Sequence, residues 1–441
     1  MNVTVIGTGY VGLVNGAGFS EFGLQVVCAD TDQEKIDGLR RGELPIYEPG
    51  LDDLVARNVK AGRLSFTADT AEAIRSGLVV FIAVGTPAAD DGSTDTRFVE
   101  SVSRDIGRNA DGYLVVVTKS TVPVGTARKV REWIQEELDA RGSRINFSVA
   151  SNPEFLREGA AIADFMRPDR VVIGTDPDDS QARAILKDLY RPLYLNETPF
   201  VLTNVPSAEL SKYAANAFLA TKISFINEVA GLCEKVGGNV QSVARAMGLD
   251  RRIGNKFLHA GPGFGGSCFP KDTLSAAYFS KQLGQSFEIV EAVIRVNRRQ
   301  RQAMVEKVLA AVEGDVSGKT IAVLGLSFKP ETDDMRDSPA VYIVEELVER
   351  GASVRAYDPQ AMAEAEKELP PITLCKDAYE ACQDADALVI VTEWNQFRML
   401  DLERVKSLLR KPILIDLRNI YEPDTLREAG FHYVSVGRPD C

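Results

Sequence analysis

A glycine-rich turn near the N-terminus constrains the fold of this chain most. The turn, GTGYVG, places Gly7, Gly9 and Gly12 between a β-branched run at 3–6 and the start of a helical pattern. Glycines at these positions permit a tight turn and close approach of a pyrophosphate, and the helix N-terminus offers amide donors to an anion. This order is typical of a βαβ unit that binds a dinucleotide. The alternative is that the glycines serve only the turn.

An acidic residue stands where such a unit needs one. Asp30 ends the second β-type run, at 25–29, about 20 residues after the turn. Its carboxylate would accept hydrogen bonds from the ribose diol of adenosine and would repel the 2′-phosphate of NADP. The predicted cofactor is therefore NAD.

Apolar runs alternate with helical stretches at both ends of the chain. In the N-terminal half they follow at 78–84, 113–117, 147–150 and 171–173. Near the C-terminus they return at 320–324, 353–357, 387–391 and 413–416, without a second GxGxxG. Fully apolar strands that alternate with helices are typical of a parallel sheet covered on both faces.

A long helical segment separates these two regions. It begins near Ser207, placed as an N-cap, and ends at Gly237-Gly238. Roughly 30 residues, or about 45 Å, exceed the usual globular helix, so we expect it to bridge two domains and to offer a face for dimerisation. More helix is expected to residue 312, interrupted by a glycine-dense loop at 259–272. The predicted fold is α/β, with two Rossmann-like domains joined by a central helical domain, divided at 1–203, 204–312 and 313–441.

Composition excludes several classes of protein. A length of 441 residues allows two or three domains, and 45% hydrophobic with 26% charged residues indicates a folded globular chain. The net charge of −12 provides no field that would attract nucleic acid or an anionic membrane. The six cysteines form no CxxC and the two histidines lie far apart, so neither a disulfide framework nor a metal site is predicted. Without a basic leader or an apolar run of roughly 18 residues, we expect a cytoplasmic protein.

A second glycine-dense segment carries reactive groups. GPGFGGSCFPKD, at 261–272, contains Cys268, Lys271 and Asp272. A nearby positive charge favours the thiolate, and a carboxylate supplies an acid or base, so Cys268 has what an activated nucleophile needs. The glycines would let backbone amides approach a phosphate. A buried structural cysteine is the alternative.

Two further pairs of polar residues could have either a role in catalysis or binding, or a purely structural role. Lys212 and Asn216 are four residues apart on one helix face and could present an ammonium and an amide to an oxyanion, although a solvated helix face is favoured when the pair is taken alone. Glu154 and Glu158, in NPEFLREG, could be a base and a ligand contact. They could equally be carboxylates that favour a helix dipole.

Eight motifs in order, over nearly the whole chain, resemble the UDP-glucose/GDP-mannose dehydrogenase family of nucleotide-sugar enzymes. The motifs are GTGYVG at 7–12, IYEPGL at 46–51, VGTP at 84–87, KSTVPVGT at 119–126, NPEFLREG at 152–159, the helix with Lys212 and Asn216, GGSCFPKD at 265–272 and GLSFKPETDDMRDSP at 325–339. An ordered set of eight is far more specific than any single motif.

The resemblance implies a four-electron oxidation of UDP-glucose to UDP-glucuronate, with two NAD reduced in succession. By similarity, Cys268 captures the aldehyde as a thiohemiacetal, and the second oxidation gives a thioester that water hydrolyses. Covalent attachment retains an aldehyde that would otherwise leave. Lys212 and Asn216 would stabilise the oxyanion, Asp272 would organise a water or act as base, and Thr121 and Glu154 would position the hydrolytic water.

The resemblance also implies two sets of binding residues. The NAD contacts would be Gly7, Gly9, Val11, Gly12, Asp30, Lys35, Thr86, Thr121, Glu158, Lys271 and Arg336. The nucleotide-sugar contacts would be Glu154, Phe155, Leu156, Lys212, Asn216, Phe257, Leu258, His259, Ala260, Gly261, Gly265 and Lys329, with Arg252 reaching across the interface of a homodimer formed through the long helix.

Other activities remain open at this level. Phe269 resembles the UDP-glucose branch, whereas GDP-mannose enzymes typically carry leucine there. A GDP-mannose or another nucleotide-sugar 6-dehydrogenase is one alternative. A two-electron hydroxyacid dehydrogenase on the same fold is another, and it would not need Cys268. A catalytically idle NAD sensor would be indicated by loss of the thiol, Lys212 or Asp272, and all three are present.

Overall fold

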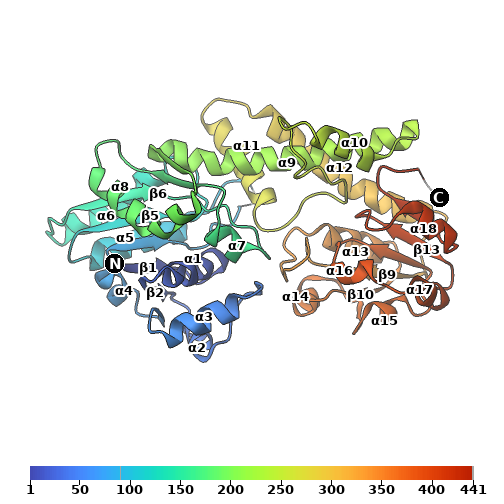
Figure 1. The fold of residues 1–441 in the computed structure, drawn as a ribbon, viewed down its shortest axis with the longest axis horizontal. Coiled ribbons are helices and arrows are strands. Elements are labelled where there is room, and N and C mark those ends of the chain that lie inside the picture. Colours follow the sequence, from blue (N-terminus) through green and yellow to red (C-terminus); the bar gives the residue numbers. More distant parts are fainter. Residues whose placement is uncertain (90, 440–441) are drawn as a thin grey trace. The chain divides into compact units, whose positions relative to one another are not determined.

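The computed structural model describes residues 1–89 and 91–439, so Cys441 lies outside the described residues. The chain divides into two compact units, Met1–Ala215 and Asn216–Cys441. In Figure 1 the first unit runs from blue to green and the second from green to red. The described residues form one multi-stranded β-sheet in each unit.

The first unit is built on an eight-stranded sheet in the order β3-β2-β1-β4-β5-β6-β7-β8. Its strands are β1 (Asn2–Ile6), β2 (Gln25–Ala29), β3 (Leu64–Thr67), β4 (Val79–Ile82), β5 (Leu114–Thr118), β6 (Phe147–Ser151), β7 (Val171–Gly174) and β8 (Phe200–Thr203). Neighbouring strands are parallel except β6 and β7. Strand order reverses between β1 and β4, and in such sheets ligands bind beyond the carboxyl ends of the strands at this point.

Helices cover both faces of this sheet. They are α1 (Tyr10–Glu21), α2 (Gln33–Arg41), α3 (Leu51–Lys60), α4 (Thr70–Ser76), α5 (Arg97–Asn109), α6 (Thr126–Ala140), α7 (Ala161–Met166) and α8 (Ser180–Leu189). On β4, Val79 and Phe81 join the cluster that includes α1 and α7, whereas Val80 and Ile82 join the cluster that includes α5 and α6. Alternate residues of a strand point to opposite faces, so both faces are buried.

The second unit combines helices with a parallel six-stranded sheet in the order β11-β10-β9-β12-β13-β14. The division between the units falls within α9 (Val205–Val236), which is followed by α10 (Val240–Gly248), α11 (Phe269–Gln282) and α12 (Glu288–Ala311). The strands are β9 (Thr320–Leu324), β10 (Ser353–Tyr357), β11 (Thr373–Leu374), β12 (Ala387–Ile390), β13 (Ile413–Asp416) and β14 (His432–Ser435). Their helices are α13 (Pro339–Glu349), α14 (Met362–Glu368), α15 (Ala378–Cys382), α16 (Asn395–Arg398), α17 (Leu402–Leu408) and α18 (Pro423–Glu428).

The predicted α/β class, with its long helix, is confirmed, and three local expectations are wrong. The N-terminal sheet is not fully parallel, because the chain reverses direction between β6 and β7. Helix α9 begins at Val205, and the Ser207 amide donates to the Asn204 side chain at 2.9 Å, so Asn204 is the capping residue. Asp272 belongs to α11 rather than to the preceding loop. The end of α9 before Gly237, which has a φ of 72°, is as expected.

Candidate active site

The glycine turn has the shape that a bound dinucleotide requires. Gly7 has a φ of 103°, and a Cβ there would lie 2.6 Å from the Ala83 carbonyl oxygen. A Cβ on Gly12 would lie 1.8 Å from the Gly7 carbonyl oxygen, so this glycine is needed for close packing. A Cβ on Gly9 would meet no atom within 4 Å, and Gly9 is the N-cap of α1. The open side of the turn therefore faces the helix N-terminus, where a pyrophosphate would bind.

Asp30 is fixed beside this turn. Its Oδ2 accepts hydrogen bonds from the Thr8 amide and hydroxyl, both at 2.8 Å, and lies 3.4 Å from the Lys35 Nζ. Burial opposes the charge, but these donors and the Asp32 amide outweigh it and lower the pKa of Asp30. An ionised carboxylate at the end of β2 suits the ribose diol of NAD, so the residues present fit this cofactor.

Two sets of contacts join segments near the turn to one another. The Thr86 hydroxyl donates to the Thr121 carbonyl at 2.9 Å, which joins the segments after β4 and β5. The Tyr10 hydroxyl donates to Glu48, whose carboxylate also accepts the Gly159 amide at 2.6 Å. The motif at 46–51 thus links the start of α1 to the segment that contains Glu158, a role that spacing alone did not reveal.

A buried ion pair lies at the end of the first unit. The Lys212 Nζ and the Glu154 Oε1 are 2.6 Å apart, and their side chains are 4% and 5% exposed. Burial disfavours the charge on Glu154, but Lys212, the Leu156 amide and the Lys119 ammonium together lower its pKa. Lys212 also lies 5.5 Å from the ring centroid of Phe155. The sequence interpretation of Lys212 as part of a solvated helix face is therefore wrong.

A second charged cluster surrounds Asp272 in the second unit. One Asp272 oxygen accepts from the Asn216 amide nitrogen and the other lies against the Lys271 Nζ, each at 2.6 Å. Asp272 is 1% exposed. The structure therefore brings three of the predicted residues together, and Lys271 is paired with Asp272.

Cys268 occupies the start of α11. It is the N-cap residue and is partly exposed, with its Sγ 3.6 Å from the Ser267 Oγ. A helix N-terminus stabilises negative charge on a nearby sulfur. In contrast, burial raises the pKa of Cys28 and of Cys382 to about 12, which leaves those thiols protonated. Of the five cysteines that the structure describes, Cys268 is thus the one placed for chemistry.

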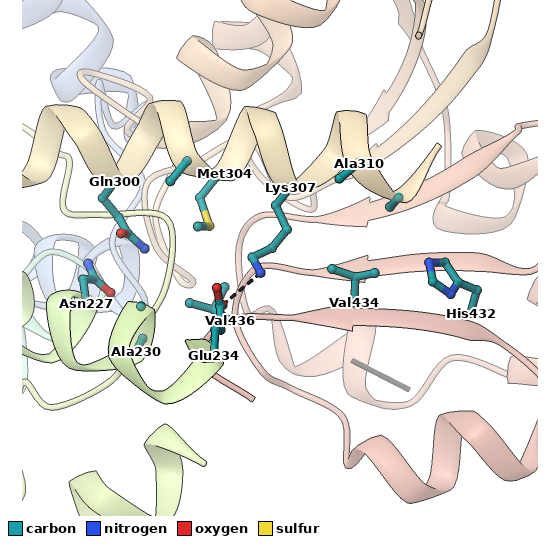
Figure 2. Close-up of a pocket in the computed structure, with 13 residues that line it drawn as sticks. Asn227, Ala230, Glu234, Gln300, Met304, Lys307, Ala310, His432, Val434 and Val436 are labelled. Carbon is teal, nitrogen blue, oxygen red and sulfur yellow. Dashed lines mark hydrogen bonds and ion pairs between the residues drawn. The ribbon is translucent and has the colours of Figure 1, made fainter. Parts of the chain in front are cut away.

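The segment after α10 is held through its backbone. The Gly261 amide donates to the Asn227 side chain at 2.9 Å, and its carbonyl accepts from the Gln300 side chain at 2.7 Å. Figure 2 shows these two side chains pointing toward one another from α9 and α12, at one end of a cavity of about 400 Å³. Asn297 binds the backbone of Phe264 through both of its amide atoms. Its Oδ1 accepts from the Phe264 amide at 2.9 Å, and its Nδ2 donates to the Phe264 carbonyl at 3.0 Å. Sequence patterns did not single out these amide side chains.

The same segment packs against the C-terminal sheet region. A Cβ on Gly265 would lie 2.3 Å from the Asp337 carbonyl oxygen, and a Cβ on Gly261 would lie 3.3 Å from the Arg418 Nη1. The Gly266 amide donates to the Arg336 carbonyl at 2.9 Å. Lys329 lies nearby, 5.3 Å from the ring of Phe328, which contacts Gly266. Arg418, at the carboxyl end of β13, was missed because it stands outside the quoted motifs.

Some predicted residues lie at the surface. Arg252 is exposed and paired with Asp250 at 2.6 Å, and His259 is exposed. The exposed Arg336 guanidinium is held by Asp334 at 2.8 Å. By contrast, Leu258, Ala260, Gly261 and Gly265 are buried. Their backbones, rather than their side chains, are what this segment can offer to a ligand.

Two other features are absent from the described residues. Within residues 1–89 and 91–439, no group of three or more His, Cys, Asp or Glu side chains has an arrangement that could hold a metal ion. In the same residues, no helix is both long and apolar enough to cross a membrane.

The turn, the ionised Asp30 and the thiol beside a buried acid define a nucleotide-dependent dehydrogenase. Residues 1–194 match the NAD binding domain, 206–299 the central domain and 322–423 the UDP binding domain of the UDP-glucose/GDP-mannose dehydrogenase family. The chain belongs to this family, which confirms the resemblance and the NAD cofactor.

Relatives match over their whole length. A UDP-glucose 6-dehydrogenase of Rhizobium meliloti is 55% identical over 100% of both chains. One from Pseudomonas aeruginosa is 47% identical over 100% of this chain and 98% of its own. The structure of a UDP-glucose dehydrogenase from Pyrobaculum islandicum has a TM-score of 0.91 at 41% identity and covers 99% of this chain and 98% of its own.

Proposed function

We propose that this protein is a UDP-glucose 6-dehydrogenase that converts UDP-glucose to UDP-glucuronate with two NAD. The observation that carries the proposal is the partly exposed Cys268 at the start of α11, four residues before the buried Asp272, in a chain 55% identical to an enzyme of that name. A two-electron hydroxyacid dehydrogenase would have no use for this thiol.

The chemistry divides into two oxidations and a hydrolysis. When bound, NAD accepts one hydride in each oxidation. Between them, the Cys268 sulfur forms a bond to the aldehyde carbon and gives a thiohemiacetal, which the second oxidation converts to a thioester. Water then adds to the thioester, the C–S bond breaks, and the thiolate leaves. One alcohol, one water and two NAD thus give one carboxylate, two NADH and three protons.

The remaining polar groups act on these steps. Lys212 and Asn216 stabilise the oxyanion that forms at the sugar carbon, since fixed donors in a buried site stabilise developing charge. Asp272 organises a water or accepts a proton. Thr121 and Glu154 position the hydrolytic water. Support comes from the burial of Lys212, Glu154 and Asp272 with their hydrogen-bond partners already in place.

The proposed enzyme has one binding site for NAD and one for UDP-glucose. In this proposal the NAD site includes Gly7, Gly9, Val11, Gly12, Asp30, Lys35, Thr86, Thr121, Glu158, Lys271 and Arg336. The UDP-glucose site includes Glu154, Phe155, Leu156, Lys212, Asn216, Phe257, Leu258, His259, Ala260, Gly261, Gly265 and Lys329. The order of the three matching family models supports domains at 1–203, 204–312 and 313–441. Its two soluble nucleotide ligands support a cytoplasmic place of action.

The substrate can be tested by counting NADH. Purified protein given limiting UDP-glucose and excess NAD is expected to form two NADH per UDP-glucose. In an equimolar mixture with GDP-mannose, UDP-glucose should be consumed first, because a site that hydrogen-bonds uracil leaves polar groups unpaired against guanine. One NADH per sugar would contradict the thioester route, whereas preference for GDP-mannose would change the substrate and leave the chemistry intact.

We also propose a homodimer formed through α9, with Arg252 contributing to the partner's site. Phe218, Phe225 and Leu232 are spaced by seven residues on this helix and are 65%, 50% and 62% exposed. Apolar residues at this spacing share one helix face, as at helix–helix interfaces. Sedimentation equilibrium should give a dimer, and Phe225→Glu should give a monomer. A monomeric native protein would exclude this interface.

A further inference from the structure

Helix α6 is capped at its N-terminus by a side chain from another helix. Its N-cap residue, Gly125, has a φ of 96° and provides no side-chain cap. Glu209 of α9 supplies the acceptors instead: its Oε2 accepts from the Gly125 amide at 2.7 Å, and its Oε1 accepts from the Ala127 amide at 2.9 Å. The first amides of a helix have no acceptor within the helix, so they need one from elsewhere. Glu209 is 3% exposed and has no role in the reaction described above.

These two hydrogen bonds hold one end of the segment at 121–125, which connects β5 to α6. At its other end, the Thr121 carbonyl accepts from the Thr86 hydroxyl at 2.9 Å. Between the ends the chain makes a tight turn, because the Thr126 amide and hydroxyl both donate to the Pro123 carbonyl, at 3.1 and 2.6 Å. A short segment with an internal turn has little freedom once both of its ends are held.

The same part of α9 carries the lysine of the buried ion pair. Glu209 and Lys212 are three residues apart, so they are neighbours on the surface of the helix. The Lys212 Nζ lies 2.6 Å from the Glu154 Oε1. Through these two side chains, α9 joins the segment that contains Thr121 to the segment that contains Glu154. These are the two residues that position the hydrolytic water in the proposed function, and all four belong to the first unit.

We propose that Glu209 is a positioning residue for the hydrolysis step, and that it keeps Thr121 in a constant position relative to Glu154 by binding the two amides at the start of α6. A water held by two groups is oriented for attack only while both groups keep their places. The two hydride transfers do not use this water. A carboxylate suits the role because both of its oxygens accept hydrogen bonds, whereas glutamine would turn an NH₂ group toward one of the amides. The inference deepens the proposed function, on which it rests.

The test compares Glu209→Gln with the native protein at saturating UDP-glucose and NAD. Hydrolysis of the thioester should slow by about 10- to 100-fold, because a misplacement of about 1 Å can cost about 100-fold in rate. Stopped-flow absorbance should show both NADH formed in a burst, at the native rate within about twofold, before slow turnover. Intact-protein mass spectrometry should show the thioester adduct accumulating in the variant. KM for UDP-glucose should change little.

Three companion variants separate the position of the carboxylate from its charge. Glu209→Asp keeps the charge but is one methylene shorter, so it should also accumulate the thioester, and it serves as the test if Glu209→Gln does not fold. Glu132→Gln, at an exposed position on α6, should behave like the native protein. In a Thr121→Val background, Glu209→Gln should slow hydrolysis no further, because the two changes then remove the same interaction. Additive slowing would mean that Glu209 does not act through Thr121.

Hydrogen exchange gives a second readout that does not depend on turnover. In the native protein the amides of Gly125 and Ala127 should exchange slowly, and in Glu209→Gln at least one of them should exchange about tenfold faster or more. Equal slowing of the burst and of hydrolysis in the variant, or rapid exchange of both amides in the native protein, would overturn the inference. Failure of the native protein to oxidise UDP-glucose would instead refute the proposed function, and the exchange rates would still decide whether Glu209 holds the start of α6.

Discussion

Cys268→Ala is expected to reduce formation of UDP-glucuronate by about 10⁴-fold or more, the scale on which removal of a covalent nucleophile acts. Without the thiol, the aldehyde cannot be held as a thiohemiacetal. Slow formation of a first NADH should survive, because hydride abstraction from the alcohol does not require sulfur. Rapid-quench analysis of nucleotide sugars alongside NADH measures both steps.

A matched control and a trapping experiment sharpen this result. Cys375→Ala should leave turnover nearly unchanged, since this thiol is buried and burial raises its pKa. Glu154→Gln or Asp272→Asn should slow hydrolysis, so that intact-protein mass spectrometry after mixing with UDP-glucose and NAD shows an adduct on Cys268. If Cys268→Ala still made acid at a near-native rate with two NADH, a hydrated-aldehyde route with Lys212 as the main electrophilic group would replace the thioester.

Lys212→Met is expected to impair both activity and stability. Loss of one preorganised donor to an oxyanion lowers kcat by about 100- to 1,000-fold. Removal of one partner from a buried ion pair destabilises a protein by about 3–5 kcal/mol, because the other charge is left buried without compensation. The thermal transition of the first unit, which contains both Lys212 and Glu154, should therefore fall. Calorimetry and steady-state kinetics measure the two effects.

Adding Glu154→Gln to Lys212→Met separates the loss of stability from the loss of activity. The double variant Lys212→Met with Glu154→Gln should recover most of the lost stability, because no unpaired charge remains, but none of the activity. Lys235→Met, at an exposed position on the same helix, should change neither. Recovery of activity in the double variant would mean that Lys212 serves only to neutralise Glu154.

The strands that sequence patterns missed are all at sheet edges. Interior strands such as β4 and β12 are apolar and buried throughout, and their runs were recognised. The missed strands are β3, β8, β11 and β14, which are the two outermost strands of each sheet. A strand paired on one side only carries polar or exposed positions, as in Leu64–Thr67 and Phe200–Thr203, so it lacks a continuous apolar signal.

The candidate site shows the same limit. Asp30 and Cys268 were identified because each stands at a fixed place relative to glycines. Glu209, Asn227 and Arg418 were not, because each acts through a contact with a residue far away in the sequence: Asn227 reaches the Gly261 amide 34 positions later. The burial of Lys212 was likewise invisible, since its partner Glu154 is 58 residues distant. A periodic sequence pattern indicates only which residues are neighbours within one helix or strand.

Three amide side chains, Asn227, Gln300 and Asn297, hold the backbone at residues 261 and 264 by hydrogen bonds. This has a consequence for how the sequences of such enzymes diverge. Amide side chains that bind peptide groups are indifferent to which side chains the loop carries. A mutation at the exposed neighbouring position 259 can therefore occur without moving the chain trace. The segment can therefore change its side chains one at a time while its backbone, which is what it can offer to a ligand, stays in place.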